Sequence, residues 1–190
     1  MESKILYFER PGAGNTDTLM RFASKRAKEL GITYIVVATT QGGTALKARE
    51  IFSDDIEIVA VTIAEGFSSK PGWCIKDENR EKLLKKNIKV LTSSHALGDG
   101  VGSAFSEKYG GKPLEEVVRD TLYLFCQGMK VCVEIVLMAA DSGIIPMNEE
   151  IMSIGGSGEG ADTCIVVKPA YPRTFLDLEI REILSKPREI

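Results

Sequence analysis

The segment between residues 34 and 62 constrains the fold more than any other, because two apolar strand-like runs flank a short helix there. Residues 34–38 are apolar and rich in β-branched side chains, which is typical of a strand covered on both faces in a parallel sheet. After a turn at residues 39–44, a helix is expected from residue 45 to about 52 and a second strand at 56–62. These short joints predict a βαβ unit whose first strand is central in the sheet.

The rest of the chain continues the alternation of strand-like and helix-like segments, separated by glycine-rich turns. We expect further strands at residues 5–8, 88–92, 151–154 and 163–168, and further helices at 16–30, 77–86, 113–127, 131–141 and 175–185. The last two strands have no helix between them, which favours antiparallel pairing. Residues 1–190 therefore read as a single three-layer α/β domain, with helices on both faces of a mostly parallel sheet and an antiparallel C-terminal hairpin.

Two stretches of the second half are harder to interpret. Residues 97–111 carry five glycines, and no element is expected before the helix at 113–127. Apolar side chains at helical spacing predict a buried stripe for that helix, formed by Leu114, Val117, Val118, Leu122 and Phe125. Residues 131–141 begin like a strand but end in a pattern closed by Gly143, so we favour a helix.

The composition of the chain limits the classes of partner that it can be expected to bind. With 190 residues, 44% of them hydrophobic, the chain can build a core without disulfide or metal support. A net charge of −3 argues against a general nucleic-acid binder. The longest apolar run, residues 135–140, is too short to span a membrane, and the acidic N-terminus leads straight into a strand pattern. We therefore expect a cytoplasmic protein with no membrane partner.

Cysteine and histidine usage argues against a metal site. The chain has one histidine and four cysteines without a C-x-x-C pair, so we expect no closed zinc site. Cys132 and Cys164 lie in apolar runs and are expected to be small buried hydrophobic residues.

In an open parallel sheet, ligands bind outside the carboxyl ends of the strands. That rule selects residues 10–15, 39–44, 63–76 and 93–102, with the glycine-rich residues 155–160 beside them. The turn at 39–44 suits a phosphate best, because small residues let backbone amides approach an anion at a helix N-terminus. The alternative is an ordinary turn in which Thr44 caps the helix. No Walker motif and no complete dinucleotide fingerprint occurs in the chain.

Single residues near these loops are open to two interpretations. His95 follows two serines at a strand end and could be a catalytic general base, a ligand contact or a structural residue. Cys74 is a candidate nucleophile in the loop at 63–76. Phe67 and Trp73 could stack on an aromatic ligand or pin their loop to the protein. Residues 134 and 141, both acidic, share a helix face that we expect to be solvated.

The residues at 34–49, 58–62 and 155–163 resemble the C-terminal domain of pyruvate kinase. In some members of that family the two corresponding loops enclose a sugar-bisphosphate effector, and the resemblance implies phosphate contacts here. The implied contacts are Thr39, Thr40, Gln41, Gly42, Gly43 and Thr44, with Gly156, Ser157 and Gly158 as a second wall. No catalytic barrel is present in the chain, so we do not expect pyruvate kinase activity.

A resemblance over more of the chain is to stand-alone archaeal proteins described as a pyruvate kinase α/β domain. It is carried by residues 66–67, 94–95, 131–134, 138–143 and 160–162. That group is associated with bound flavin mononucleotide (FMN), which implies a ribityl phosphate at residues 39–44 and ring contacts from two other loops. The residues concerned in those loops are Gly66, Phe67, Ser93, Ser94 and His95.

We therefore expect a domain that binds a phosphorylated small molecule, with FMN as the first hypothesis. If the chain is an enzyme, a flavin-dependent oxidoreductase is the expected type. A regulatory module that binds a sugar phosphate is the alternative, and a His95-dependent hydrolase is the second alternative. The apolar content is compatible with a homodimer.

Overall fold

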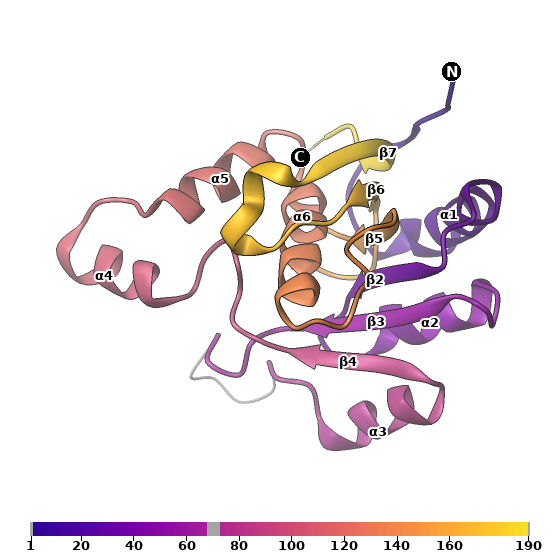
Figure 1. Cartoon of the computed structure of the whole chain (residues 1–190), viewed down its shortest axis with the longest axis horizontal. Helices are drawn as coiled ribbons and strands as arrows, with labels where there is room; N and C mark the ends of the chain where they lie inside the picture. Colours follow the sequence, from indigo (N-terminus) through magenta and orange to yellow (C-terminus); the bar gives the residue numbers. More distant parts are fainter. Residues whose placement is uncertain (1, 68–72, 190) are drawn as a thin grey trace.

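The computed structural model describes residues 2–67 and 73–189, and a seven-stranded sheet runs through its centre (Figure 1). The strand order is β1-β7-β6-β5-β2-β3-β4. The strands are β1 (Leu6–Phe8), β2 (Tyr34–Ala38), β3 (Glu57–Thr62), β4 (Ile88–Thr92), β5 (Ile151–Gly155), β6 (Thr163–Lys168) and β7 (Glu179–Pro187). Neighbouring strands are parallel except where β6 pairs with β5 and with β7. The predicted mostly parallel α/β sheet with an antiparallel C-terminal hairpin is confirmed.

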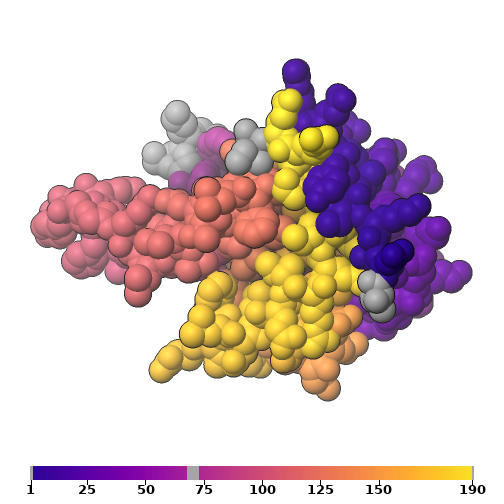
Figure 2. All heavy atoms as spheres, turned by 90° about the horizontal axis from the view of Figure 1, so that it is seen from above, coloured from indigo at the N-terminus to yellow at the C-terminus, as the bar shows by residue number. Residues whose placement is uncertain are grey.

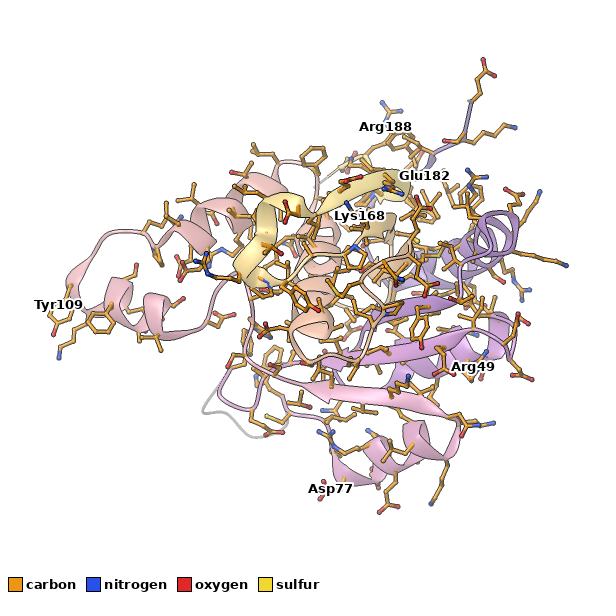
Figure 3. All side chains as sticks on the ribbon, in the orientation of Figure 1. Arg49, Asp77, Tyr109, Lys168, Glu182 and Arg188 are labelled. Carbon is orange, nitrogen blue, oxygen red and sulfur yellow. The ribbon has the colours of Figure 1, made fainter. Side chains whose placement is uncertain are left out.

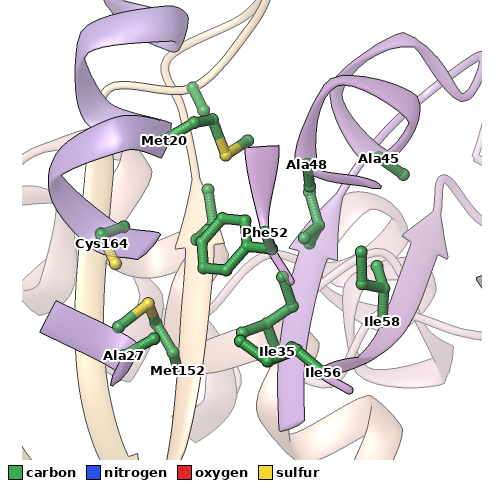
Figure 4. Packing of buried hydrophobic residues seen from close by; sticks show 14 of the residues in the cluster. Met20, Ala27, Ile35, Ala45, Ala48, Phe52, Ile56, Ile58, Met152 and Cys164 are labelled. Atoms are coloured by element: carbon green, nitrogen blue, oxygen red, sulfur yellow. The ribbon is translucent and has the colours of Figure 1, made fainter. Parts of the chain in front are cut away.

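Helices cover both faces of the sheet and make the domain three-layered. They are α1 (Thr16–Leu30), α2 (Gly43–Ile51), α3 (Asp77–Lys85), α4 (Val101–Tyr109), α5 (Leu114–Tyr123) and α6 (Gln127–Asp141), with 3-10 turns η1 (Ala13–Asn15) and η2 (Pro172–Asp177). On β2, Ile35 and Val37 pack in one core cluster with α1 and α2 (Figure 4), while Val36 packs in a second cluster with α6. The period of two residues thus places apolar side chains on both faces of a central strand, as the sequence predicted.

The C-terminal helix expected at residues 175–185 is wrong. The chain instead forms η2 and then β7, which pairs antiparallel with β6 and parallel with β1. Burial begins near the end of this strand, where Leu184 and Ser185 are fully covered. A strand fits here because β6 would otherwise leave a row of backbone groups unpaired at its outer edge. Tertiary pairing overrides the local helical pattern.

The prediction of a helix at residues 113–127 is also wrong, both in the length of the helix and in which of its side chains are buried. The glycine-rich stretch before it contains α4, and α5 ends at Tyr123 before a new helix begins at Gln127. In the predicted stripe, Val118 and Leu122 pack against the core, but three members are exposed to solvent. Those three are Leu114 (82%), Val117 (47%) and Phe125 (47%).

The reason for this exposure is that α4 and α5 project from the body as a hairpin of helices (Figure 2). Residues 101–125, which we call the arm, therefore have few neighbours to cover them. Elsewhere the predictions hold: Cys132 and Cys164 are fully buried, and α1 ends at Gly31, whose φ of 69° provides a left-handed cap. In the described part of the chain, no helix is both long and apolar enough to cross a membrane.

Candidate functional site

The carboxyl ends of β2, β3, β4 and β5 lie at one edge of the sheet, because these strands are mutually parallel. The loops that follow them surround a cavity of about 730 Å³, whose remaining wall is a face of α6 together with Tyr123 at the end of α5. This volume lies within the range of small-molecule sites. Nine of the residues predicted to bind a ligand line it: Thr39, Thr40, Gln41, Gly43, Thr44, Phe67, His95, Gly156 and Gly158. Five others, all in the described chain, lie outside the lining: Gly42, Gly66, Ser93, Ser94 and Ser157.

The turn after β2 aims the N-terminus of α2 at this cavity. Thr39 Oγ1 accepts a hydrogen bond from the Gly42 amide at 3.0 Å, which closes the turn. Gly42 has a φ of 93°, a left-handed conformation that glycine adopts without strain. Helix geometry leaves the first amides of α2 without partners inside the helix, and Gly43 and Thr44 at this terminus line the cavity. The turn therefore offers donors and a positive helix end to an anion.

Gln41 stabilises the neighbouring loop. Its Nε2 donates to the Cys74 carbonyl at 2.8 Å, and its Oε1 accepts from the Lys76 amide and from Asn79 Nδ2, both at 3.2 Å. These bonds fix the loop before α3 against the turn after β2. The Gln41 side chain is thus committed to positioning, although the residue also lines the cavity.

Three rings form an aromatic wall. The Phe67 ring lies edge-on to Trp73 at 5.7 Å between centroids, and 5.5 Å from the His95 ring. His95 Nδ1 lies 2.8 Å from Asp99 Oδ2, and His95 Nε2 accepts from the Ala64 amide at 3.4 Å. This acceptor role assigns the ring proton to Nδ1, which donates it to Asp99. Residues 68–72, part of the loop predicted to be functional, lie outside the described residues.

The arrangement gives little support to a hydrolase. Both ring nitrogens of His95 are engaged, and no described serine or cysteine donates to the imidazole. The Cys74 thiol bonds backbone carbonyls in its own loop. Its contact with Glu65, burial, and the charge of Glu65 raise the pKa of Cys74 above its usual value. A raised pKa lowers the fraction of the nucleophilic thiolate at neutral pH.

The floor of the cavity on α6 carries a charged pair that the sequence interpretation missed. Lys130 Nζ lies 2.5 Å from Glu134 Oε2, and Glu134 Oε1 accepts from the Leu97 amide at 3.0 Å. Both side chains line the cavity and are buried, with 7% and 4% of the residue exposed. The expectation of a solvated face is wrong for Glu134 but right for Asp141, which is exposed.

A lysine four residues before a glutamate in an otherwise apolar helix could have identified this pair. Residues of opposite charge at that spacing meet on a helix surface. Here the surface they share faces the cavity, which Val131, Ile135 and Met138 of α6 also line. Because both side chains line the cavity, the pair is placed to contact a ligand there.

The glycine loop after β5 is held by a buried carboxylate. Asp162 Oδ2 accepts from the amides of Gly12 and Ser157, and Asp162 Oδ1 accepts from the Thr163 hydroxyl. The Ser157 amide is thus used inside the loop. Residues 10–15, also predicted at this edge, brace the glycine loop through Gly12 and do not line the cavity. Across the described residues, no group of three or more His, Cys, Asp and Glu could hold a metal ion.

The geometry defines a class: an α/β domain with a small-molecule cavity at the carboxyl edge of its parallel strands. The family model of the pyruvate kinase alpha/beta domain matches residues 17–167, so the chain belongs to that family. This membership confirms the resemblance to the C-terminal domain of pyruvate kinase.

Solved pyruvate kinases from Cryptosporidium parvum are similar to the chain at low identity. One is 14% identical and covers 81% of this chain with a TM-score of 0.43. A second is 15% identical and covers 85% with a TM-score of 0.41, and a third, in complex with ADP, is 17% identical and covers 84% with a TM-score of 0.38. The chain spans only 22%, 23% and 24% of the lengths of these enzymes.

Proposed function

We propose that this chain binds a phosphorylated small molecule in the cavity, and that the ligand is FMN. The observation that carries the proposal is that one cavity combines a helix N-terminus, an aromatic wall and a buried lysine. FMN has a phosphate, a hydroxylated chain and a flat aromatic ring, and these features match that combination in chemistry.

The phosphate would bind at the start of α2. Gly43 and Thr44 supply amides and a hydroxyl there, and the helix dipole favours a negative group. Gly156 and Gly158 line the same cavity from the loop after β5. Glycines leave room for a phosphate and ribityl chain to approach the backbone closely.

The ring would lie against Phe67 and Trp73, which present aromatic surface to the cavity. Both rings are partly exposed, at 40% and 44%, so a planar ligand that covers them gains apolar burial and stacking. Bound FMN supplies hydride and electron transfer. The protein would hold the ring, exclude water with Val131, Ile135 and Met138 of α6 and place the Lys130 ammonium in the cavity.

The test is an absorption spectrum of the purified protein, followed by mass analysis of any molecule that acid releases. Titration with FMN then gives the affinity of protein freed of ligand. We expect a flavin spectrum, or saturable uptake of added FMN with quenching of its fluorescence by the aromatic wall. A colourless protein that takes up no FMN contradicts the proposal.

A sugar phosphate is the second candidate ligand. The buried Lys130–Glu134 pair favours it, because a carboxylate and an ammonium in a cavity suit the hydroxyl groups of a sugar. Under this alternative the domain is a regulatory module. Calorimetric titration with a sugar bisphosphate distinguishes the two, since a sugar phosphate that binds to protein unable to take up FMN supports the module.

A further inference from the structure

The arm carries an unusual concentration of exposed apolar side chains. Of the sixteen large hydrophobic residues exposed in the described chain, eight lie in the 25 residues of the arm. They are Val101, Phe105, Tyr109, Leu114, Val117, Tyr123, Leu124 and Phe125. Figure 3 shows Tyr109 at the far tip, pointing away from the body. Exposed apolar residues are ordinary when scattered but indicate an interaction surface when they gather in one place.

The arm is polar inside and apolar outside, which reverses the usual pattern. The buried residues of α4 and α5 are polar, namely Ser103 and Glu116. The Ser103 hydroxyl donates to Glu116 Oε1 at 2.6 Å between the two helices. Arg119 bonds Asp120 at 2.9 Å and approaches Glu116 at 3.4 Å. A polar contact, Ser103–Glu116, thus links the two helices, and the apolar side chains other than Val118 and Leu122, which pack against the core, remain for a partner.

These apolar side chains follow helical seams. On α4, Val101, Phe105 and Tyr109 recur at every fourth residue, and the last two rings lie 5.9 Å apart. On α5, Leu114 and Val117 are followed by Thr121 and, at the C-cap, Leu124, a spacing of three, four and three residues. This is the spacing by which one helix packs along another.

Thr121 is the polar residue of the α5 seam, and its hydroxyl group already has a hydrogen-bond partner. Thr121 Oγ1 donates to the Val117 carbonyl at 2.8 Å within α5. Its methyl group is therefore available for apolar packing, and a partner that covers the seam would not bury a hydroxyl group without a hydrogen bond. The two seams are the exposed apolar side chains that the arm offers for docking.

We propose that this surface is the interface of a homodimer, in which the arms of two copies pack against each other about a two-fold axis. The exposed apolar side chains of the arm other than Tyr123, which lines the cavity, would bury on the order of 800 Å² on each copy, the amount typical of one side of a stable interface. A homodimer makes the surface self-complementary. The arm carries three basic and four acidic residues, so it neither repels a second copy strongly nor offers the basic excess that an anionic membrane attracts.

The test is the mass of the 190-residue chain in solution, from light scattering at concentrations from about 1 to about 100 μM. We expect twice the 20.8 kDa of one chain for the unmodified protein. The double variant Leu114→Glu/Leu124→Glu should be monomeric, because the dissociation constant of the dimer should increase at least about 100-fold. Both leucines are about four-fifths exposed, at 82% and 77%, so the substitutions should leave the monomer folded.

The matched control is Leu176→Glu, which changes a leucine that is 94% exposed on η2, outside the arm. It should keep the dimer mass. Circular dichroism of all variants verifies folding. An unmodified protein that is monomeric over the whole range overturns the proposal, and so does a dimer that persists in the double variant. Co-sedimentation of the monomer with anionic vesicles would assign the surface to a membrane instead, which also overturns the proposal.

Discussion

Replacement of Lys130 by Met tests whether the charged pair on α6 is truly buried. The substitution leaves Glu134 with the Leu97 amide as its remaining partner among the described residues. Exposed ion pairs contribute about 0–1 kcal/mol, whereas breaking a buried pair costs about 3–5 kcal/mol. The exposures of 7% and 4% place this pair in the second class. Because the pair borders a cavity, we expect the lower end, a loss of about 3 kcal/mol.

The double variant Lys130→Met/Glu134→Gln separates structure from function. It removes both charges, and the glutamine carbonyl can still accept from the Leu97 amide. Uncharged side chains of similar volume can replace a buried pair at little cost in stability. The free energy of unfolding of the double variant should therefore lie within about 1 kcal/mol of that of the original protein. If the pair serves the ligand, FMN affinity should nevertheless fall at least about tenfold, or about 1.4 kcal/mol.

The assay is urea unfolding followed by circular dichroism at pH 7, with FMN titration of each variant. The single variants Lys130→Met and Glu134→Gln, the double variant and the original protein form a double-mutant cycle that gives the coupling energy between the two side chains. A loss below about 1 kcal/mol in Lys130→Met would refute the argument from burial. Unchanged FMN affinity in the double variant would instead remove the pair from the ligand site and leave its burial intact.

Three further outcomes are expected. Thr44→Val should weaken FMN binding by about 1–3 kcal/mol if the hydroxyl contacts the phosphate, and equal affinity would remove Thr44 from the site. Gly128→Ala should lower stability in urea by about 1–3 kcal/mol, because its Cβ would collide with Thr163; Gly14→Ala, which meets open space, should not. Burial raises the pKa of Cys132 and Cys164. When the folded protein is treated with iodoacetamide at pH 8, mass spectrometry should therefore find both cysteines unmodified, and they should become alkylated only after the protein is unfolded.

The half of the fold that the sequence predicted best is the half governed by local pattern. The apolar run at Tyr34–Ala38 requires cover on both faces, and the cap at Gly31 ends α1 where expected. The strand β7 could not be predicted, because its identity depends on the free edge of β6 and not on its own residues. The arm could not be predicted either, because helical periodicity shows that apolar residues share a face but not that this face meets solvent.

The candidate site shows the same division. Residues that follow a strand end, such as Thr44 and His95, can be assigned to one edge from topology alone, and the structure does bring them to one cavity. Lys130 was missed because it lies in the first turn of α6 and does not follow a strand end. Its place in the cavity depends on how α6 packs across the sheet, which no short motif encodes. Ser93 and Ser94 were expected to contact the ligand ring because of the family resemblance of the His95 loop, and they lie outside the cavity lining.

The pairing of β1 with β7 has a consequence for how the domain is made. Leu6 lies opposite Ser185 and Phe8 opposite Pro187, so the first strand of the sheet finds its partner only in the last. On the ribosome, β1 must remain unpaired until β7, about 170 residues further along the chain, has been synthesised. Such a contact has the longest loop to close and carries only three residues of pairing. The edge strand β1 should therefore be the last part of the sheet to order and the first to fray.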